Sequence, residues 1–385
     1  MKSLNKSPLY WRLSGFYFFY FASLGALIPY WSLYLKDIGF SPLEISELMA
    51  VIMATKIVSP NIWGWIADHT GKRMAIVRLG SLLAFVFFIG VFFTNQYGWL
   101  VVFLLLFSFF WNAALPQFEA TTLHHLTDKP HQYSGIRLWG SVGFILAVAA
   151  LGPYFEWFSV QHLPYIISAL LFGIWLSSLS VPEHAAKHLS VSHVSLRSIL
   201  KRPEVITLLA VCFLAQASHG GYYTFYTLYM EGYDYSRSVI GSLWALGVFA
   251  EVAVFMAMHK LVPRFGLRNL FLFSFAITTL RWLLIGTFAD NFIIVVIAQI
   301  FHAASFGIYH AVAIQLYHRF FPGKHAGKGQ ALYSSLSFGA GGAFGIYVSG
   351  QSWQQLGPES LFYFAAGMSL LALILAWLWL KEDVS

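Results

Sequence analysis

Charged side chains are scarce in this chain: Asp, Glu, Lys and Arg together make up 10% of its 385 residues. Soluble domains carry about 25% charged residues, so a chain of this composition cannot cover a water-facing surface. Cysteine is almost absent as well, and the single Cys212 lies in an apolar stretch, which excludes a disulfide framework. Because no cysteine cluster exists, we expect no metal site, and we expect no cofactor.

Long apolar segments make up most of the chain. Hydrophobic residue types account for 58% of the chain, and a membrane-spanning helix needs about 20 mostly apolar residues. The first apolar segment is too long for a cleaved signal peptide. The chain is therefore predicted to be an all-α polytopic membrane protein, with twelve transmembrane helices over residues 10–35, 44–66, 74–94, 97–122, 134–156, 163–181, 204–230, 238–262, 268–288, 291–317, 328–351 and 359–380.

The formal net charge of +7 has a one-sided distribution along these spans. If the N-terminus is cytoplasmic, all but four of the 23 Lys and Arg residues fall on the cytoplasmic side. This is the positive-inside pattern of membrane proteins. It predicts that both termini are cytoplasmic, and it leaves no excess of positive charge that would indicate nucleic acid as a partner.

Two copies of one pattern divide the chain into halves. A shift of 195 residues carries residues 40–45 onto 235–240, and the same shift carries residues 71–73 onto 266–268. The only long polar connection lies between them. We therefore expect two pseudo-symmetric six-helix bundles, residues 1–181 and 204–385, joined by a cytoplasmic linker over 182–203. Parallel repeats of this kind place the substrate site between the halves, near the membrane midplane.

A charged turn between the second and third spans is the most specific motif. It contains Gly64, Asp68, Gly71, Lys72 and Arg73. Glycine permits a tight turn, and Asp68 can meet backbone N–H groups, Lys72 or Arg73 at a helix end. The pattern resembles the loop between helices 2 and 3 of the major facilitator superfamily, where it acts in gating. The second copy has Pro263 at the position of Asp68, so only the first copy is expected to act as the full gating turn.

Ionisable residues inside the spans are costly and usually mark function. Glu251 and Arg281 are equally distant along the chain from Gly266, which places both roughly 15–18 Å deep on adjacent helices. An ion pair between them is expected, either structural or with Glu251 taking up and releasing a proton. By the same symmetry Glu119 and Arg137 lie at equal, shallower depth. Lys56 is predicted near the midplane, where snorkelling to an interface is difficult.

Histidine and aromatic side chains accompany these charges. His219 in span 7 and His302 in span 10 lie near mid-span, with His310 two turns below His302, and each is either a hydrogen-bonded core residue or a proton carrier. A stripe at helical spacing in span 7 joins His219 with three tyrosines, and span 8 adds Trp244 on the face of Glu251. Such stripes are usually packing, but phenols near mid-span need partners there. We expect a substrate cavity for an organic anion, lined by Lys56, Glu119, Arg137, His219, Tyr222, Tyr226 and Trp244.

A narrower resemblance runs along the whole chain. Residues 15–21, 29–36, 136–144, 219–223, 243–251, 281–282 and 299–302 are similar to the 3-phenylpropionate permease group, which is related to nucleoside and lactose proton symporters. The resemblance implies a proton-coupled importer of the bacterial inner membrane, acting on an aromatic acid such as phenylpropionate.

The lactose-type relatives also suggest roles for individual residues. In them a Glu on span 4 and an Arg on span 5 bind substrate, matched here by Glu119 and Arg137. An acid on span 8 and an Arg on span 9 are matched by Glu251 and Arg281. Their acidic proton site on span 10 is replaced here by histidines, so the resemblance leaves the proton carrier open among these groups.

Several alternatives remain at this point. A nucleoside or oligosaccharide proton symporter and a drug efflux antiporter are rival transporters, although span 5 lacks a clear antiporter string. A membrane enzyme would need a nucleophile and base or a metal, and neither stands out. A transport-fold receptor without flux is a further option. The expected partners are a small-molecule substrate, protons and the lipid bilayer, and we expect a monomer.

Overall fold

A computed structural model describes residues 7–127, 132–183, 196–322 and 326–380, and these residues are helical apart from short connections. The helices of the first half are α1 (Pro8–Asp37), α2 (Pro42–Thr70), α3 (Arg73–Ile89), α4 (Tyr97–His125), α5 (Tyr133–Trp157) and α6 (Leu163–Leu179), with the short helices η1 (Gly90–Phe93) and η3 (Val160–His162). A short helix α7 (Leu196–Leu200) follows within the predicted linker, of which residues 184–195 lie outside the described part of the chain.

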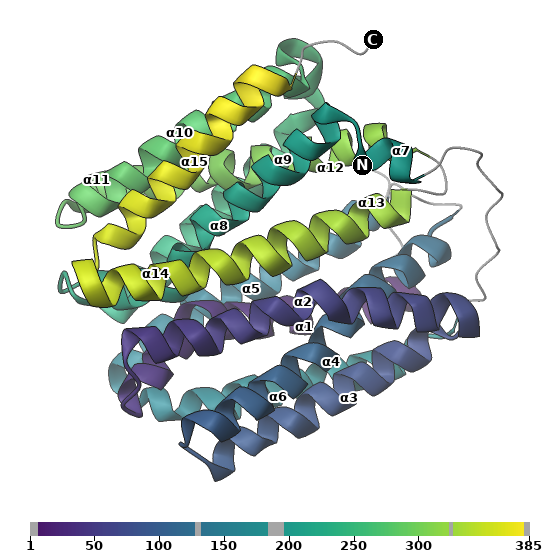
Figure 1. The fold of residues 1–385 in the computed structure, drawn as a ribbon. Coiled ribbons are helices and arrows are strands. Elements are labelled where there is room, and N and C mark those ends of the chain that lie inside the picture. The colour runs from purple at the N-terminus through teal and green to yellow at the C-terminus, as the bar shows by residue number, and fades with distance from the viewer. Residues whose placement is uncertain (1–6, 128–131, 184–195, 323–325, 381–385) are drawn as a thin grey trace.

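The helices of the second half are α8 (Pro203–Glu231), α9 (Arg237–Phe265), α10 (Leu267–Thr287), α11 (Phe292–Ile300), η4 (Ala303–Ile308), α12 (Tyr309–Phe320), α13 (Ala326–Leu332), η6 (Tyr333–Gly341), α14 (Gly342–Leu356) and α15 (Ser360–Trp379). Here η4 and η6 are π-helical, and each lies within a longer helix. Figure 1 shows α1 to α6 grouped together beside the helices that follow α7.

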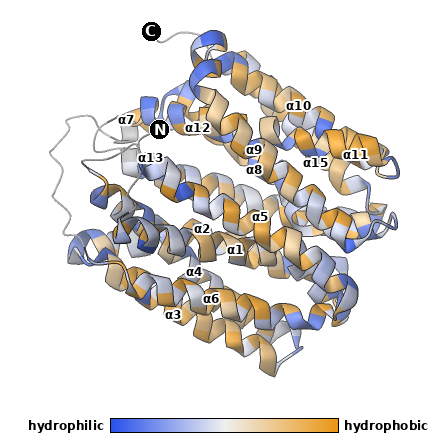
Figure 2. Cartoon of the chain, turned by 180° about the vertical axis from the view of Figure 1, so that it is seen from behind, coloured by the Kyte–Doolittle hydropathy of each residue, from blue (hydrophilic) through white to orange (hydrophobic). Residues whose placement is uncertain are grey.

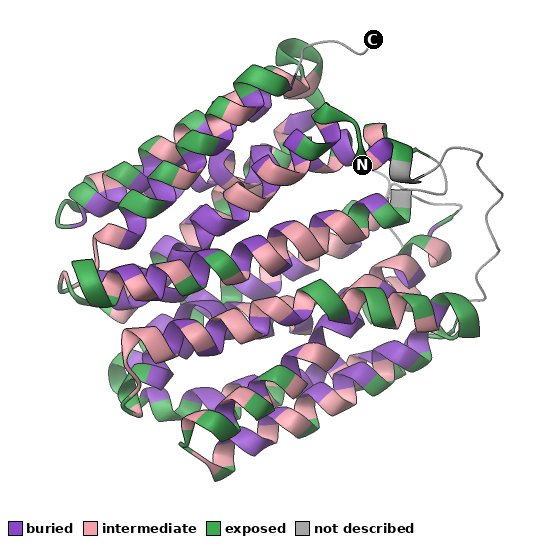
Figure 3. Ribbon diagram, viewed as in Figure 1, coloured by how far each residue is buried: buried purple, intermediate pink, exposed green. Residues whose placement is uncertain are grey.

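Eleven helices in the described residues are long and apolar enough to cross a membrane. The predicted span 328–351 coincides with the uninterrupted helix α13–η6–α14, whose many glycines and serines lower its hydropathy. Hydrophobic residues (orange) are frequent along the helices in Figure 2. Figure 3 shows the buried residues as stripes along them. The all-α polytopic architecture predicted from the sequence is therefore confirmed.

The 195-residue shift recurs in the helix bounds. It maps α2 onto α9 from first to last residue, and it maps the start of α1 onto the start of α8. It also maps α4 onto the combined helix α11–η4–α12. Ser41 and Ser236 cap the N-termini of α2 and α9 in the same way, each accepting a hydrogen bond from the third residue of its helix.

The two groups of helices pack together mainly at one end, which we call the Ser41 end. There Arg237 of α9 donates a hydrogen bond to the carbonyl of Phe155 on α5 (2.8 Å), and the backbone N–H of Ser238 donates one to Glu156 Oε1 (2.9 Å). A Cβ at Gly241 would lie 2.5 Å from the Val148 carbonyl, so α5 and α9 are in close contact. The opposite end, with the α2–α3 turn and α7, is called the Asp68 end.

The hydrophobic core follows this division. One buried cluster contains residues from both groups of helices, including Tyr30 and Phe155 from one and Tyr226 and Ile240 from the other. A second cluster contains only residues between Ile199 and Leu380. The continuous core therefore joins the halves toward the Ser41 end.

Candidate transport site

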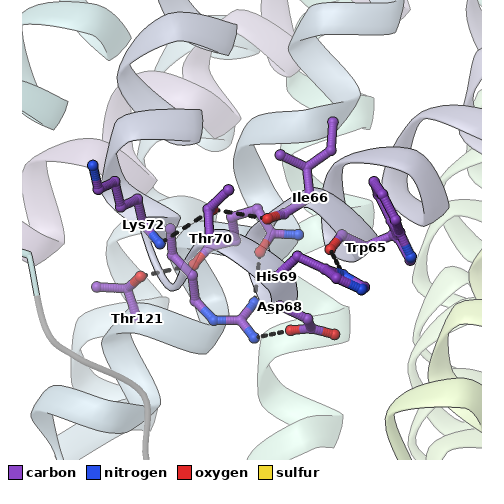
Figure 4. A network of polar contacts seen from close by, with 9 residues as sticks. Trp65, Ile66, Asp68, His69, Thr70, Lys72 and Thr121 are labelled. Atoms are coloured by element: carbon purple, nitrogen blue, oxygen red, sulfur yellow. Dashed lines mark hydrogen bonds and ion pairs between the residues drawn. The ribbon is translucent and has the colours of Figure 1, made fainter.

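Figure 4 shows the polar contacts around Asp68 and Lys72 in the charged turn at the Asp68 end. One arginine, Arg73, joins the parts of this turn. Arg73 donates from Nη2 to Asp68 Oδ1 at 2.5 Å and from Nη1 to Gln117 Oε1 at 2.6 Å. Of the two basic side chains expected to meet Asp68, Arg73 is therefore the one that does, while Lys72 is exposed. The arginine ties the end of α2 to the start of α3 and to α4.

The boundary of this turn differs from the prediction. Helix α2 continues to Thr70, past the expected end near residue 66, so Asp68 lies in its last turn and not in a loop. The reason is Gly71, which caps the helix in the left-handed conformation (φ 68°) that favours glycine. Gly64 lies earlier in α2 and faces α4, since a Cβ there would be 3.7 Å from the Gln117 amide nitrogen.

The second copy of the turn keeps a glycine of positive φ but neither the acid nor the αL conformation, since ψ is 158° at Gly266 and 3° at Gly71. Gly266 has a φ of 73°, close to that of Gly71. Pro263 lies within the last turn of α9, and Arg268 donates to the backbone carbonyls of Trp377 and Leu380 at the end of α15. Since Pro263 has no carboxylate, the ion pair that Asp68 forms with Arg73 has no counterpart at the equivalent position.

Glu119 and Arg137 lie together, as the depth argument predicted. Their closest atoms, Glu119 Oε1 and Arg137 Nε, are 3.9 Å apart, and both side chains are partly exposed, at 26% and 32%. The guanidinium also stacks over the Phe21 ring, 3.9 Å from its centroid. Arg137 is thus a partly accessible cation between an acid and an aromatic ring, which is a suitable contact for an aromatic anion.

The expected ion pair between Glu251 and Arg281 is not formed, and this corrects the prediction. Glu251 instead lies beside His302, with 3.4 Å between Glu251 Oε2 and His302 Nε2. Arg281 donates to the Ala298 carbonyl (2.9 Å), to Ser305 Oγ (3.0 Å) and to Gln299 Oε1 (3.4 Å). Glu251 and Arg281 both contact the same part of span 10, at His302 and Ser305. They do not meet, because the depth of a residue does not determine the side of the helix on which it lies.

Arg281 is fully buried within the second half. The rings of Tyr222 and Trp282 flank its guanidinium, each with its centroid 4.4 Å away. A solute cannot touch this cation in the conformation described, so Arg281 supports the surrounding helices here and does not line the site.

The predicted stripe on span 7 is also buried. His219, Tyr222 and Tyr226 have at most 1% exposure. Tyr222 packs against Trp244, with 4.5 Å between ring centroids, and donates to Gln299 Oε1 at 3.0 Å. Helical periodicity placed these residues correctly on one face, but that face packs against α9, α10 and α11. These side chains lie beneath the candidate site, and a substrate could contact them only if the helices packed against them moved.

The histidines of span 10 form a column of stacked rings. Phe306 lies between His302 and His310, at centroid distances of 5.7 and 5.4 Å and interplanar angles of 10° and 8°. His310 Nδ1 is 2.8 Å from the hydroxyl of Tyr333 on η6. The π-helical segment η4 lies within this column, and nothing in the sequence pattern indicated it.

Lys56 is partly buried in α2 and forms no ion pair with any acid in the described residues. Its Nζ lies 5.9 Å from the centroid of Phe338 on η6. Sequence reasoning had identified this lysine but missed Phe21 and Phe338, the rings beside the two accessible cations, because phenylalanine is abundant in every span. Tyr223, half-buried next to the buried stripe, was also missed.

No group of three or more His, Cys, Asp or Glu that could hold a metal ion occurs in the described ranges. The site instead combines accessible cations, a carboxylate beside a histidine, and aromatic rings, within helices that cross a membrane. These features define a polytopic membrane transporter with an interior site for a small solute.

Comparison with known proteins places this transporter in a family. The model of the MFS_1 like family matches residues 10–364, and the chain belongs to that family. It is 29% identical to the probable 3-phenylpropionic acid transporter of Escherichia coli (strain K12) over 370 residues, covering 95% of this chain and 96% of that protein. It is 26% identical to the maltose permease of Geobacillus stearothermophilus over 353 residues, covering 90% and 89% of the two chains.

Among solved structures, a mutant of the nucleoside transporter NupG has a similar fold, with a TM-score of 0.84 at 16% identity. The match covers 97% of this chain and all of that one. The protein is therefore a multi-pass membrane transporter of the major facilitator type, as the resemblance in its sequence implied.

Proposed function

We propose that this transporter is a proton-coupled symporter that imports an aromatic monocarboxylate, such as 3-phenylpropionate, across the bacterial inner membrane. The observation that supports it most directly is Glu251, a partly buried carboxylate in mid-span beside His302 and separate from Arg281. A carboxylate held away from a permanent cation can be protonated and deprotonated during a cycle, which a proton carrier requires.

The substrate in this proposal is recognised by cations and rings together. Lys56 has no acidic partner among the described residues and lies by Phe338, while Arg137 stacks on Phe21. A carboxylate bound by Lys56 or Arg137 would leave the substrate's ring among these aromatic side chains. The printed name of the Escherichia coli relative, a probable 3-phenylpropionic acid transporter, agrees with this chemistry.

Alternating access completes the proposed mechanism. Two bundles, residues 1–181 and 204–385, rock against each other about the central site. The charged turn with Asp68 controls the rate of that motion, and His302 and His310 assist proton exchange at Glu251. The distribution of Lys and Arg supports cytoplasmic termini, so the Ser41 end faces outward. We propose that a monomer carries out the full cycle.

The test uses purified protein in liposomes, with an imposed pH gradient and labelled 3-phenylpropionate. The wild type should accumulate the acid uphill, with proton uptake. E251Q should abolish uphill accumulation while retaining exchange of substrate across the membrane, since exchange need not deprotonate the carrier. E204Q, in the first turn of α8, is the matched control and should behave as wild type.

Two outcomes would overturn the proposal. Competition by neutral nucleosides or oligosaccharides, with no effect from aromatic carboxylates, would reject the substrate class. If E251Q still accumulates substrate against a gradient and H302A does not, the proton is carried on span 10 instead.

A further inference from the structure

Lys56 and Glu251 occupy equivalent positions in the two repeats. The shift that maps α2 onto α9 also maps Lys56 onto Glu251, and each follows its capping serine, Ser41 or Ser236, by the same number of residues. At about 1.5 Å per residue, both lie roughly 22 Å from the Ser41 end. The two halves therefore present opposite charges at the same depth.

Neither charge is balanced within its own half. Lys56 has an aromatic neighbour but no ion pair in the described residues, and Glu251 has only His302 within ion-pair distance there. Other charges also face this site. Arg137 and His310 act on Glu251 electrostatically, but Arg137 already has the carboxylate of Glu119 at 3.9 Å. Arg281 is buried among carbonyl and hydroxyl acceptors.

Closure of the site makes the balance of these two charges important. When the walls meet, water leaves and the dielectric constant falls, so that an unbalanced charge becomes costly while a matched pair is tolerated. The empty site is balanced when Lys56 is protonated and Glu251 is ionised. With Glu251 protonated, the site is balanced only if a substrate contributes one negative charge.

We propose that Lys56 is the coupling partner of Glu251, and that the carrier closes only when the charges of these two residues and the substrate cancel. This inference rests on the proposed symport function and extends it. It assigns one proton to each monoanion, with no net charge moved per cycle. It also makes the substrate's carboxylate the replacement for Glu251 as the counterion of Lys56.

The rule predicts different behaviour for each variant. In E251Q, Lys56 is balanced only by bound substrate anion, so the empty carrier cannot close and only exchange remains. In K56Q/E251Q, the empty site is neutral, and so is a site that holds an uncharged analogue. This double variant should therefore carry the amide of the acid downhill without protons, whereas E251Q should not.

The experiment compares these variants in liposomes, with labelled 3-phenylpropionate, labelled 3-phenylpropanamide and a pH-sensitive dye. Net downhill flux of the amide should be at least tenfold higher in K56Q/E251Q than in E251Q. K36Q/E251Q, which alters a lysine at the Ser41 end of α1, is the control and should stay as low as E251Q. The charge-swapped K56E/E251K tests the rule independently, since it should regain proton-coupled uptake that K56E and E251K each lose.

Failure of this inference can be told apart from failure of the proposed function. If the wild type moves no protons with the acid, the symport proposal fails. If the wild type is coupled but K56Q still accumulates the anion with one proton, only the pairing of Lys56 with Glu251 is rejected. Amide flux in the double variant no higher than in E251Q would also reject it, as would net charge movement during wild-type uptake.

Discussion

Neutralising Asp68 tests whether the charged turn acts on the rate of conformational change. Asp68 is joined to Arg73, which also binds Gln117 on α4. Two turns earlier on the same helix, Asn61 donates to Ser335 Oγ at 2.8 Å, which links α2 to η6 of the other half. The last turns of α2 therefore contact α3 and α4 in the same half and η6 in the other half. Asp68 itself lies more than three helical turns from Lys56.

The exposure of Asp68 limits the size of the effect. Its side chain is 66% exposed, and exposed ion pairs contribute only about 0.2–1 kcal/mol. Arg73 keeps its bond to Gln117 when Asp68 becomes Asn. The change in the activation free energy should therefore not exceed about 1 kcal/mol. Since about 1.4 kcal/mol corresponds to a tenfold change in rate, D68N should slow turnover by about fivefold at most and leave the substrate Kd unchanged.

Initial rates of uptake at saturating substrate and equilibrium binding by calorimetry, measured on the same preparation, check this expectation. D37N is the matched control, because Asp37 is also an acid in a last helical turn, where Gln161 donates to it at 3.1 Å. A large loss of affinity with normal turnover would show that Asp68 acts on binding. A loss of turnover clearly beyond about fivefold would refute the reasoning from an exposed ion pair.

Three further substitutions have expected outcomes that follow from local contacts. G345V should lower the free energy of unfolding by about 1–3 kcal/mol or more, because a Cβ at Gly345 already overlaps the backbone of α8. Thermal unfolding in detergent checks this. G367V is the control and should be neutral, because a Cβ at Gly367 has open space. E183A should cost about 0.5–2 kcal/mol, because the Glu183 carboxylate accepts hydrogen bonds from two backbone N–H groups at the start of α3, and a melting temperature equal to that of E204A would contradict it. R281M should reduce stability by leaving buried acceptors unpaired, yet keep substrate Kd within about threefold in the folded fraction; binding titrations that find a folded protein without affinity would place Arg281 in the site.

Much of the fold could be predicted because it rests on two strong sequence signals. Apolar length identified the spans, and the repeat at 195 residues, found from two loops, reappears in the bounds of α2 and α9. The ends of these helices were predicted too early, since apolar content falls before the backbone stops being helical. Gly71 determines where α2 ends, and Asp68 belongs to the helix for that reason.

The sequence predicted the membrane depth of each charged site residue but not which neighbouring helix its side chain faces. Counting residues from a turn gave the level of each charge, and for Glu119 and Arg137 this was sufficient. For Glu251 it was not, because the neighbour that meets it, His302, comes from a helix that is distant in sequence. The rotation of each helix about its axis is determined by packing on all sides, here by Trp244 and Trp282 against α8, which a single sequence does not record.

The π-helical segment η4 has a consequence for how the ring column of span 10 can move. A π-helical turn holds more residues than an α-helical turn, and such turns occur mostly as short interruptions at functional positions. Converting the segment from π to α geometry would change the register of everything beyond it by one residue, which is a rotation of roughly 100° about the helix axis. His302 precedes the segment and His310 follows it. A change from π to α geometry in η4 would therefore rotate His310 away from Phe306 and Tyr333, while His302 would stay beside Glu251.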